Sequence, residues 1–167
     1  MRSGCGNLIA HMTRIRIAEP CASPSRVEGE AEGLDMGLDM YLRGEKFLWS
    51  DWNNPANNRT EDGFKVSTLT LELGYWRKHP NLHGYIVNTF AEGVDECQRI
   101  DLNENQLQQI IDAVNNPSSL PHTEGFFFGQ SDGNERDDDV KQLTAALEWL
   151  TTKDSKSSRS VFYEASW

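Results

Sequence analysis

The spacing of apolar residues changes several times after Met36, and this feature most constrains how the chain can fold. Residues 38–42 alternate apolar and polar side chains, which predicts a half-buried strand. Residues 107–114 instead repeat apolar side chains every third or fourth position, which predicts an amphipathic helix. Both spacings recur, but not in regular strand–helix–strand order, so an α+β domain is expected rather than a doubly wound sheet.

The expected fold is a single small α+β domain with a mixed or antiparallel sheet of four to five short strands and three helices. The expected strands are 38–42 (extended by 47–49, or returned by them as a hairpin through Arg43-Gly44), 64–73, 97–102, 125–129 and an edge strand at 161–163. The stretch 69–73 also permits a helix. The expected helices are 81–90, a second one capped by Asn103 with Gln106 in the capping-box position, and a third that starts at 137–139 and ends near Lys153. Residues 51–63 are rich in Asn, Asp, Pro and Gly, which predicts a loop.

Residues 1–35 differ from the rest in carrying no clear periodic pattern. Polar and basic residues interrupt their apolar positions, unlike a secretory signal, and they contain acidic residues, unlike an organelle transit peptide. We therefore expect a disordered leader or a start codon assigned too early, followed by a domain at 36–153 and by a polar linker with a terminal strand at 154–167.

Composition limits the classes of function. The 167-residue chain has a net charge of -10, which disfavours direct nucleic-acid binding because phosphate contacts need clustered Lys and Arg. No stretch approaches the roughly 20 apolar residues of a membrane-spanning helix. Three cysteines, of which Cys97 stands alone in the domain, make a disulfide framework an unexpected feature and indicate a reducing, cytoplasmic setting.

One cluster has the composition of a ligand site. Tyr75, Trp76, Arg77, Lys78 and His83 combine two aromatic residues with cations in an otherwise acidic chain. Aromatic rings can stack on a base while a guanidinium binds phosphate, so the cluster suits a nucleotide-like ligand. The alternative is that the aromatic rings fill the core and the cations face solvent.

Other constellations are weaker. His83 could pair with Cys97 or Asp95 for acid–base or nucleophilic chemistry, although the spacing matches no nucleophile motif. The acidic run at 132–139 lacks the register of a calcium loop and is interpreted as helix capping and solvation. His79 and His122 lack a partner at metal-ligand spacing, so both are expected at the surface. No cofactor and no metal are expected.

Four sequence blocks resemble a family of small phage and prophage proteins, in the same order. They are Met-Gly-Leu-Asp-Met-Tyr-Leu at 36–42, Leu-Gly-Tyr-Trp-Arg-Lys at 73–78 with His83 after it, Gly-Val-Asp-Glu-Cys at 93–97 and Gly-Phe-Phe-Phe-Gly at 125–129. The resemblance covers about residues 36–150, and the first block is the family's N-terminus. It implies a phage origin and a cytoplasmic site of action in an infected bacterium. A phosphoglycerate kinase label attached to such proteins does not fit, because the chain is too short for a two-domain kinase and lacks a Gly-rich phosphate loop.

Three functions follow from these observations. The first is a phage accessory protein that binds a host protein or a phosphorylated small molecule through the cluster at 75–78 and His83. The second is a small hydrolase or transferase that uses His83 with Cys97 or Asp95. The third is an acidic decoy of nucleic acid, which requires one continuous acidic face.

Overall fold

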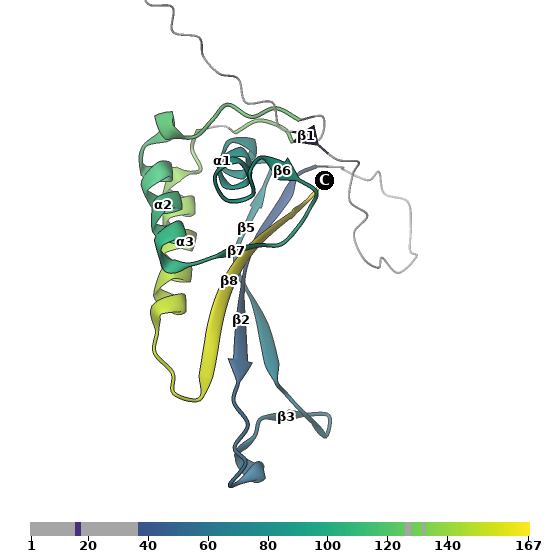
Figure 1. The fold of residues 1–167 in the computed structure, drawn as a ribbon. Coiled ribbons are helices and arrows are strands. Elements are labelled where there is room, and N and C mark those ends of the chain that lie inside the picture. Colours follow the sequence, from purple (N-terminus) through teal and green to yellow (C-terminus); the bar gives the residue numbers. More distant parts are fainter. Residues whose placement is uncertain (1–15, 18–36, 126–127, 132) are drawn as a thin grey trace, which may run out of the picture.

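The computed structural model describes residues 16–17, 37–125, 128–131 and 133–167. Within them, a four-stranded antiparallel sheet carries three α-helices on one face (Figure 1). The expected α+β class is confirmed. No helix in these ranges is long and apolar enough to cross a membrane.

The main sheet has the order β5-β2-β8-β7, and every neighbouring pair is antiparallel. Its strands are β2 (Asp39–Leu48), β5 (Thr68–Arg77), β7 (Ile100–Leu102) and β8 (Ser157–Ser166). The strand expected at 38–42 is confirmed, but no hairpin forms at Arg43-Gly44, and β2 continues without a break. A bulge offsets its register with β5 between Leu42 and Arg43. Glycine is required at 44 because a Cβ there would lie 2.7 Å from the Trp149 ring.

The expectation of a terminal edge strand was wrong. β8 lies between β2 and β7, and its residues Val161 and Tyr163 are 1% exposed. The local sequence of a central strand does not differ from that of any other short apolar segment. Its central position depends on pairing with strands that are distant in the sequence.

The three helices form where the sequence predicts them. They are α1 (Pro80–Phe90), α2 (Glu104–Asn115) and α3 (Arg136–Thr151). The capping box of α2 is present, with Asn103 Oδ1 accepting from Gln106 N and Gln106 Oε1 accepting from Asn103 N. In α3 Leu143 is fully buried, and Val140, Leu147 and Leu150 are partly buried and pack against the core.

Alternation along the strands gives the sheet two different faces. The inner face carries Leu38, Met40 and Leu42 against the helices, and these side chains are at most 1% exposed. On the outer face lie Arg43, which is paired with Glu164 at 2.9 Å, and Phe162, which is covered by the Arg99 guanidinium at 3.8 Å from the ring centroid.

The β2–β5 pair extends beyond the helices as an arm, here defined as residues 47–71 (Figure 1). The far part of the arm holds the 3-10 helix η1 (Pro55–Asn57) and the short strands β3 (Thr60–Glu61) and β4 (Phe64–Lys65). The expected loop at 51–63 therefore contains a turn of helix and the start of a small hairpin.

Two short segments lie at the other end of the molecule. Strand β1 (Arg16–Ile17), within the expected leader, pairs in parallel with β6 (Val94–Asp95). The strand expected at 125–129 is not observed at its described residues: Phe128 N donates to Gly125 O at 3.1 Å, which closes a turn. Phe126 and Phe127 lie outside the described residues.

Segment 121–125 crosses α1 at Gly84. A Cβ at Gly84 would overlap Thr123 Oγ1 and lie 2.9 Å from Thr123 Cβ, so only glycine allows this approach. Thr123 is buried, and its N–H donates to Asn81 Oδ1 at 3.1 Å. The contact fixes the segment that forms one wall of the pocket described below.

We expect Gly84→Ala to lower the free energy of unfolding by about 1–3 kcal/mol, the usual cost of overpacking, although alanine favours a helix over glycine by about 1 kcal/mol. Urea denaturation measures the change. Thr89→Ala, at an exposed position of α1, is the matched control and should change stability by less than about 0.5 kcal/mol. Thr123→Ala in the Gly84→Ala background should recover part of the loss. A Gly84→Ala variant as stable as the wild type would contradict the steric argument.

Candidate functional site

A chain of polar side chains runs from the core to the surface at the start of α1. Trp76 Nε1 donates to Asp139 Oδ1 at 2.7 Å, and Asp139 Oδ2 lies 3.0 Å from His79 Nε2. The other ring nitrogen of His79, Nδ1, lies 2.9 Å from Ser131 Oγ. We call these four residues the Ser131 relay. His79 and Asp139 are 4% and 1% exposed, whereas Ser131 is half-buried.

The hydrogen bonds determine which ring nitrogen carries the proton. With Asp139 ionised and the His79 ring neutral, the ring carries its proton on Nε2 and donates it to the carboxylate, which can only accept. Nδ1 is then the acceptor, and the Ser131 hydroxyl donates to it. Asn81 N–H donates to Ser131 Oγ at 3.3 Å. The relay therefore aligns a serine hydroxyl, an unprotonated imidazole nitrogen and a buried carboxylate.

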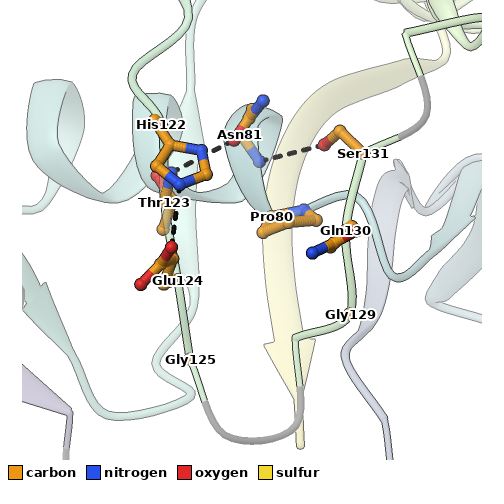
Figure 2. Close-up of a pocket in the computed structure, with 9 residues that line it drawn as sticks. All are labelled: Pro80, Asn81, His122, Thr123, Glu124, Gly125, Gly129, Gln130 and Ser131. Atoms are coloured by element: carbon orange, nitrogen blue, oxygen red, sulfur yellow. Dashed lines mark hydrogen bonds and ion pairs between the residues drawn. The ribbon is translucent and has the colours of Figure 1, made fainter.

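Ser131 opens onto a pocket of about 750 Å³ between two chain segments and the start of α1 (Figure 2). Its described lining residues are Pro80, Asn81, His122, Thr123, Glu124, Gly125, Gly129, Gln130 and Ser131. Four of these nine residues are uncharged and polar, and His122 and Glu124 pair with each other at 2.9 Å. A smaller cavity of about 80 Å³ shares Asn81 and Ser131 and reaches His79 and Asp139.

A second buried network surrounds His83. Its Nε2 lies 2.8 Å from Asp95 Oδ2, and its Nδ1 lies 2.7 Å from the Tyr163 hydroxyl. Edge contacts from Phe128 and Trp167, with ring centroids at 5.1 and 5.7 Å, complete the enclosure. Burial raises the pKa of Tyr163 well above its usual value, and the nearby Asp95 charge adds to this shift. Both ring nitrogens of His83 are engaged, and the side chain is 1% exposed.

The five residues expected to form one ligand site lie on different sides of the sheet. Tyr75 and Arg77 are on the outer face, where both donate to Asp39 Oδ1, at 2.6 and 2.8 Å. Burial raises the pKa of Tyr75, and the hydrogen bond to Asp39 raises it further. Trp76 is on the inner face, in the Ser131 relay.

Of the remaining two members, Lys78 has its side chain near that of Arg77, since a Cβ at Gly37 would lie 2.7 Å from Lys78 Cε and 3.3 Å from Arg77 Nη2. Lys78 follows β5 with a φ of 58°, and its N–H donates to Leu38 O at 2.8 Å. Its side chain packs close to Gly129, where a Cβ would lie 2.9 Å from that of Lys78. His83 is enclosed by its own network. The five side chains thus do not converge on one pocket, and nucleotide binding by them stays a prediction.

The structure brings His83 and Asp95 within hydrogen-bond reach, at 2.8 Å, and acid–base chemistry by this pair stays a prediction. Neither lines the pocket of Figure 2. Cys97 was expected to stand alone, but it is disulfide-bonded. A disulfide sulfur has no thiolate to act as nucleophile. The other cysteines, Cys5 and Cys21, lie outside the described residues.

Two residues were placed wrongly at the surface. His79 is buried rather than exposed, because Asp139 and Ser131 satisfy both ring nitrogens. Asp139 is not a solvated helix-capping residue, unlike its exposed neighbours Asp137 and Asp138. His122 is exposed as expected. No group of three or more His, Cys, Asp or Glu side chains suited to a metal ion occurs within the described ranges.

The arm carries most of the large apolar side chains that are exposed in the described structure. Trp52 is 86% and Phe64 78% exposed, and the others on the arm are Phe47, Trp49 and Leu71, at 39–53%. Single exposed apolar residues are common, but a group on one protruding element is typical of an interaction site.

Hydrogen bonds to the Asp51 carboxylate link residues within the tip of the arm. Asp51 Oδ1 accepts from Asn53 N and Asn54 N at 3.1 and 2.8 Å, and Oδ2 accepts from Asn57 Nδ2 at 3.0 Å. The Asn57 hydrogen bond is the main reason that the pKa of Asp51 is lowered. Lys65 lies over the Trp52 ring, 5.8 Å from its centroid.

Sequence reasoning missed the Ser131 relay and the arm for different reasons. The relay joins residues up to 63 positions apart, and no spacing motif marks them. The arm had a usable signal, because residues 47–64 contain two Trp and two Phe around a turn-rich stretch, and Trp52 lies within the predicted loop at 51–63.

Comparison with known proteins adds no assignment: no family model, no curated protein and no solved structure matches this chain.

Proposed function

We propose that this protein is a binding protein that docks on a partner protein through the exposed side chains of its arm. The group formed by Phe47, Trp49, Trp52, Phe64 and Leu71 is the observation that carries the proposal. Aromatic residues are enriched at protein interfaces, and tryptophans are frequent among the residues that dominate binding energy.

The partner is a protein with an apolar pocket or groove. Trp52 and Phe64 offer two large rings for such a recess, and the bonds around Asp51 keep the tip ordered before binding. An ordered arm loses less conformational entropy on association than a flexible one. The resemblance to phage proteins supports a bacterial host protein as this partner.

The other functions considered receive less support. Nucleotide binding through Arg77 competes with Asp39, which already accepts hydrogen bonds from both Arg77 and Tyr75. An acidic decoy needs a continuous acidic face, but Glu164 and Glu45 on the outer face are paired with arginines at 2.9 Å. Alternating charges of this kind do not reproduce the phosphate spacing of nucleic acid.

Photo-crosslinking tests the proposal. A benzophenone amino acid at position 64 should yield one dominant adduct with a bacterial host protein, and the same group at Val94, exposed at the other end of the molecule, should not. The crosslinked protein is then purified, and calorimetry measures its affinity. Trp52→Ala should weaken binding by at least about 30-fold, which is the effect of a binding hot spot.

Val94→Ala is the matched control and should leave the affinity unchanged. The free energy of unfolding of each variant should lie within about 0.5 kcal/mol of the wild-type value, because Trp52 and Val94 are exposed. Equal affinity of the Trp52→Ala variant would contradict the proposal. So would an adduct formed only with a second copy of this chain, since the arm would then be a self-association surface.

A further inference from the structure

The Ser131 relay has the geometry of an activated nucleophile, which is independent of the arm and of its partner. Ser131 Oγ lies 2.9 Å from His79 Nδ1, within the reach needed for proton transfer. His79 Nε2 is held at 3.0 Å by Asp139, which Trp76 orients in turn. A nucleophile, a base and a group that orients the base are the three parts of a serine hydrolase site.

We propose that Ser131 is a nucleophile that attacks the carbonyl carbon of uncharged acyl esters, with His79 as its general base and Asp139 as a positioning residue. Serine bonds to Nδ1 and aspartate to Nε2 in this relay. Either nitrogen can act as the base, because a neutral imidazole has one donor and one acceptor nitrogen and the hydrogen bonds determine which is which.

Access to Ser131 distinguishes this relay from the His83 network. Ser131 is half-buried and lines the pocket of about 750 Å³, a volume in the usual range for small-molecule sites (Figure 2). The base and the carboxylate behind it are at most 4% exposed, so water does not compete for their hydrogen bonds. The ring nitrogens of His83, by contrast, contact Asp95 and the Tyr163 hydroxyl, and aromatic rings enclose the side chain.

The start of α1 lies where negative charge would develop. Asn81 N–H, in the first turn of this 11-residue helix, donates to Ser131 Oγ at 3.3 Å. N–H groups in a first turn lack partners within the helix, and the helix dipole favours an anion there. An oxyanion formed on a carbonyl bound to Ser131 Oγ would therefore be stabilised by this end of α1.

The lining of the pocket indicates the class of substrate. Neither Lys nor Arg is among its described lining residues, and the one acidic side chain, Glu124, is paired with His122. The other polar groups are amides and hydroxyls, which suit an uncharged polar acyl group better than a phosphate or a carboxylate.

The reaction has two balanced steps. Ser131 Oγ bonds to the carbonyl carbon while its proton moves to His79 Nδ1, and the ester C–O bond breaks as that proton passes to the leaving alcohol. Water then attacks the acyl-serine, gives its proton to His79 Nδ1 and releases the acid, and the proton returns to Ser131 Oγ. No oxidant, metal or cofactor takes part in either step.

The test uses the full chain with two probes, a fluorophosphonate and p-nitrophenyl acetate. Peptide mass spectrometry should find the fluorophosphonate on Ser131, and labelling should disappear when the protein is first denatured. Ser131→Ala should lower the rate of p-nitrophenol release at least about 100-fold, the lower end of what acid–base catalysis contributes. Ser160→Ala, at an exposed serine of β8, should leave the rate unchanged.

Asp139→Asn separates catalysis from a purely structural role. The NH2 group of the new asparagine donates a hydrogen bond to His79 Nε2, so the ring carries its proton on Nδ1. His79 Nδ1 then cannot accept the proton of the Ser131 hydroxyl. Labelling should then fall about as far as in Ser131→Ala, while circular dichroism shows a folded protein. Labelling of wild type no faster than of Ser131→Ala, or a label mapped to another residue, would overturn the proposal. If the Asp139→Asn variant does not fold, the proposal is tested by the residue that the fluorophosphonate labels and by the rate of p-nitrophenol release from the Ser131→Ala variant.

Discussion

Asp139→Ala is expected to lower the free energy of unfolding by about 2–6 kcal/mol, because it leaves two buried donors without an acceptor at about 1–3 kcal/mol each. The alanine leaves Trp76 Nε1 and His79 Nε2 as buried donors without an acceptor. It also removes the link between α3, which carries Asp139, and the segment between β5 and α1. Since small domains are stable by only about 5–15 kcal/mol, this single change removes a large share of the total.

Urea denaturation followed by tryptophan fluorescence measures the loss. The matched control is Asp138→Ala, one position earlier in α3, which removes the same charge from an exposed site and should change stability by less than about 0.5 kcal/mol. Asp139→Asn should cost less than alanine, about 1–3 kcal/mol, because its amide can still pair with both neighbours after the His79 ring changes its protonated nitrogen. If Asp138→Ala and Asp139→Ala lowered the free energy of unfolding by similar amounts, the structural role of Asp139 in the buried network would be contradicted.

Local signals in the sequence predicted the elements, because those signals act over a few residues. The capping box of Asn103 and Gln106 spans three positions and is formed as expected. The alternation at 38–42 correctly predicted that Leu38, Met40 and Leu42 share the buried side, the last two of them on β2. Helix α1 begins at Pro80, where a missing N–H has no cost in the first turn.

Long-range pairing explains the errors. Gly44 looked like a turn residue, but it lies within β2 because Trp149, more than 100 positions later, fills the space above it. Val161 and Tyr163 were predicted to form an edge strand, because the neighbouring sequence carries no signal that β8 also pairs with β7. In both cases the deciding contact is made by an element distant in sequence.

The candidate site was harder to predict for the same reason. Asp137, Asp138 and Asp139 share composition and local spacing, yet only Asp139 points inward and meets Trp76 and His79. A helix buries about one face, so one residue of such a run can be buried while its neighbours are solvated. The sequence contained the residues of the Ser131 relay but no information on which of them meet.

His83→Leu is expected to cost a similar amount, about 3–5 kcal/mol, because it leaves a buried carboxylate without its partner. Asp95 Oδ2 loses the ring nitrogen at 2.8 Å, and the Tyr163 hydroxyl loses its contact at 2.7 Å. His122→Leu is the matched control, since His122 is exposed and should change stability by less than about 0.5 kcal/mol. If both changes cost the same, the network around His83 contributes nothing specific.

Replacing both members of the pair separates the network from simple loss of volume. The double variant His83→Leu/Asp95→Leu should lose clearly less stability than the sum of the two single variants, because no buried charge is left without a partner. Tyr163→Phe should cost about 1–3 kcal/mol, since it leaves His83 Nδ1 unpaired. Strict additivity in the double variant would show that the two side chains do not interact.

The same network predicts how stability changes in alkali. Burial raises the pKa of Tyr163 in the folded protein, so its contribution to stability is complete below the unfolded value of about 10 and is lost as the pH rises above it. Absorbance near 295 nm should therefore show Tyr163 ionising only as the protein unfolds. In Tyr163→Phe the free energy of unfolding should fall less steeply above pH 10 than in the wild type. An equal slope in the two proteins would mean that the pKa of Tyr163 is the same in the folded and the unfolded protein, and that its burial does not raise it.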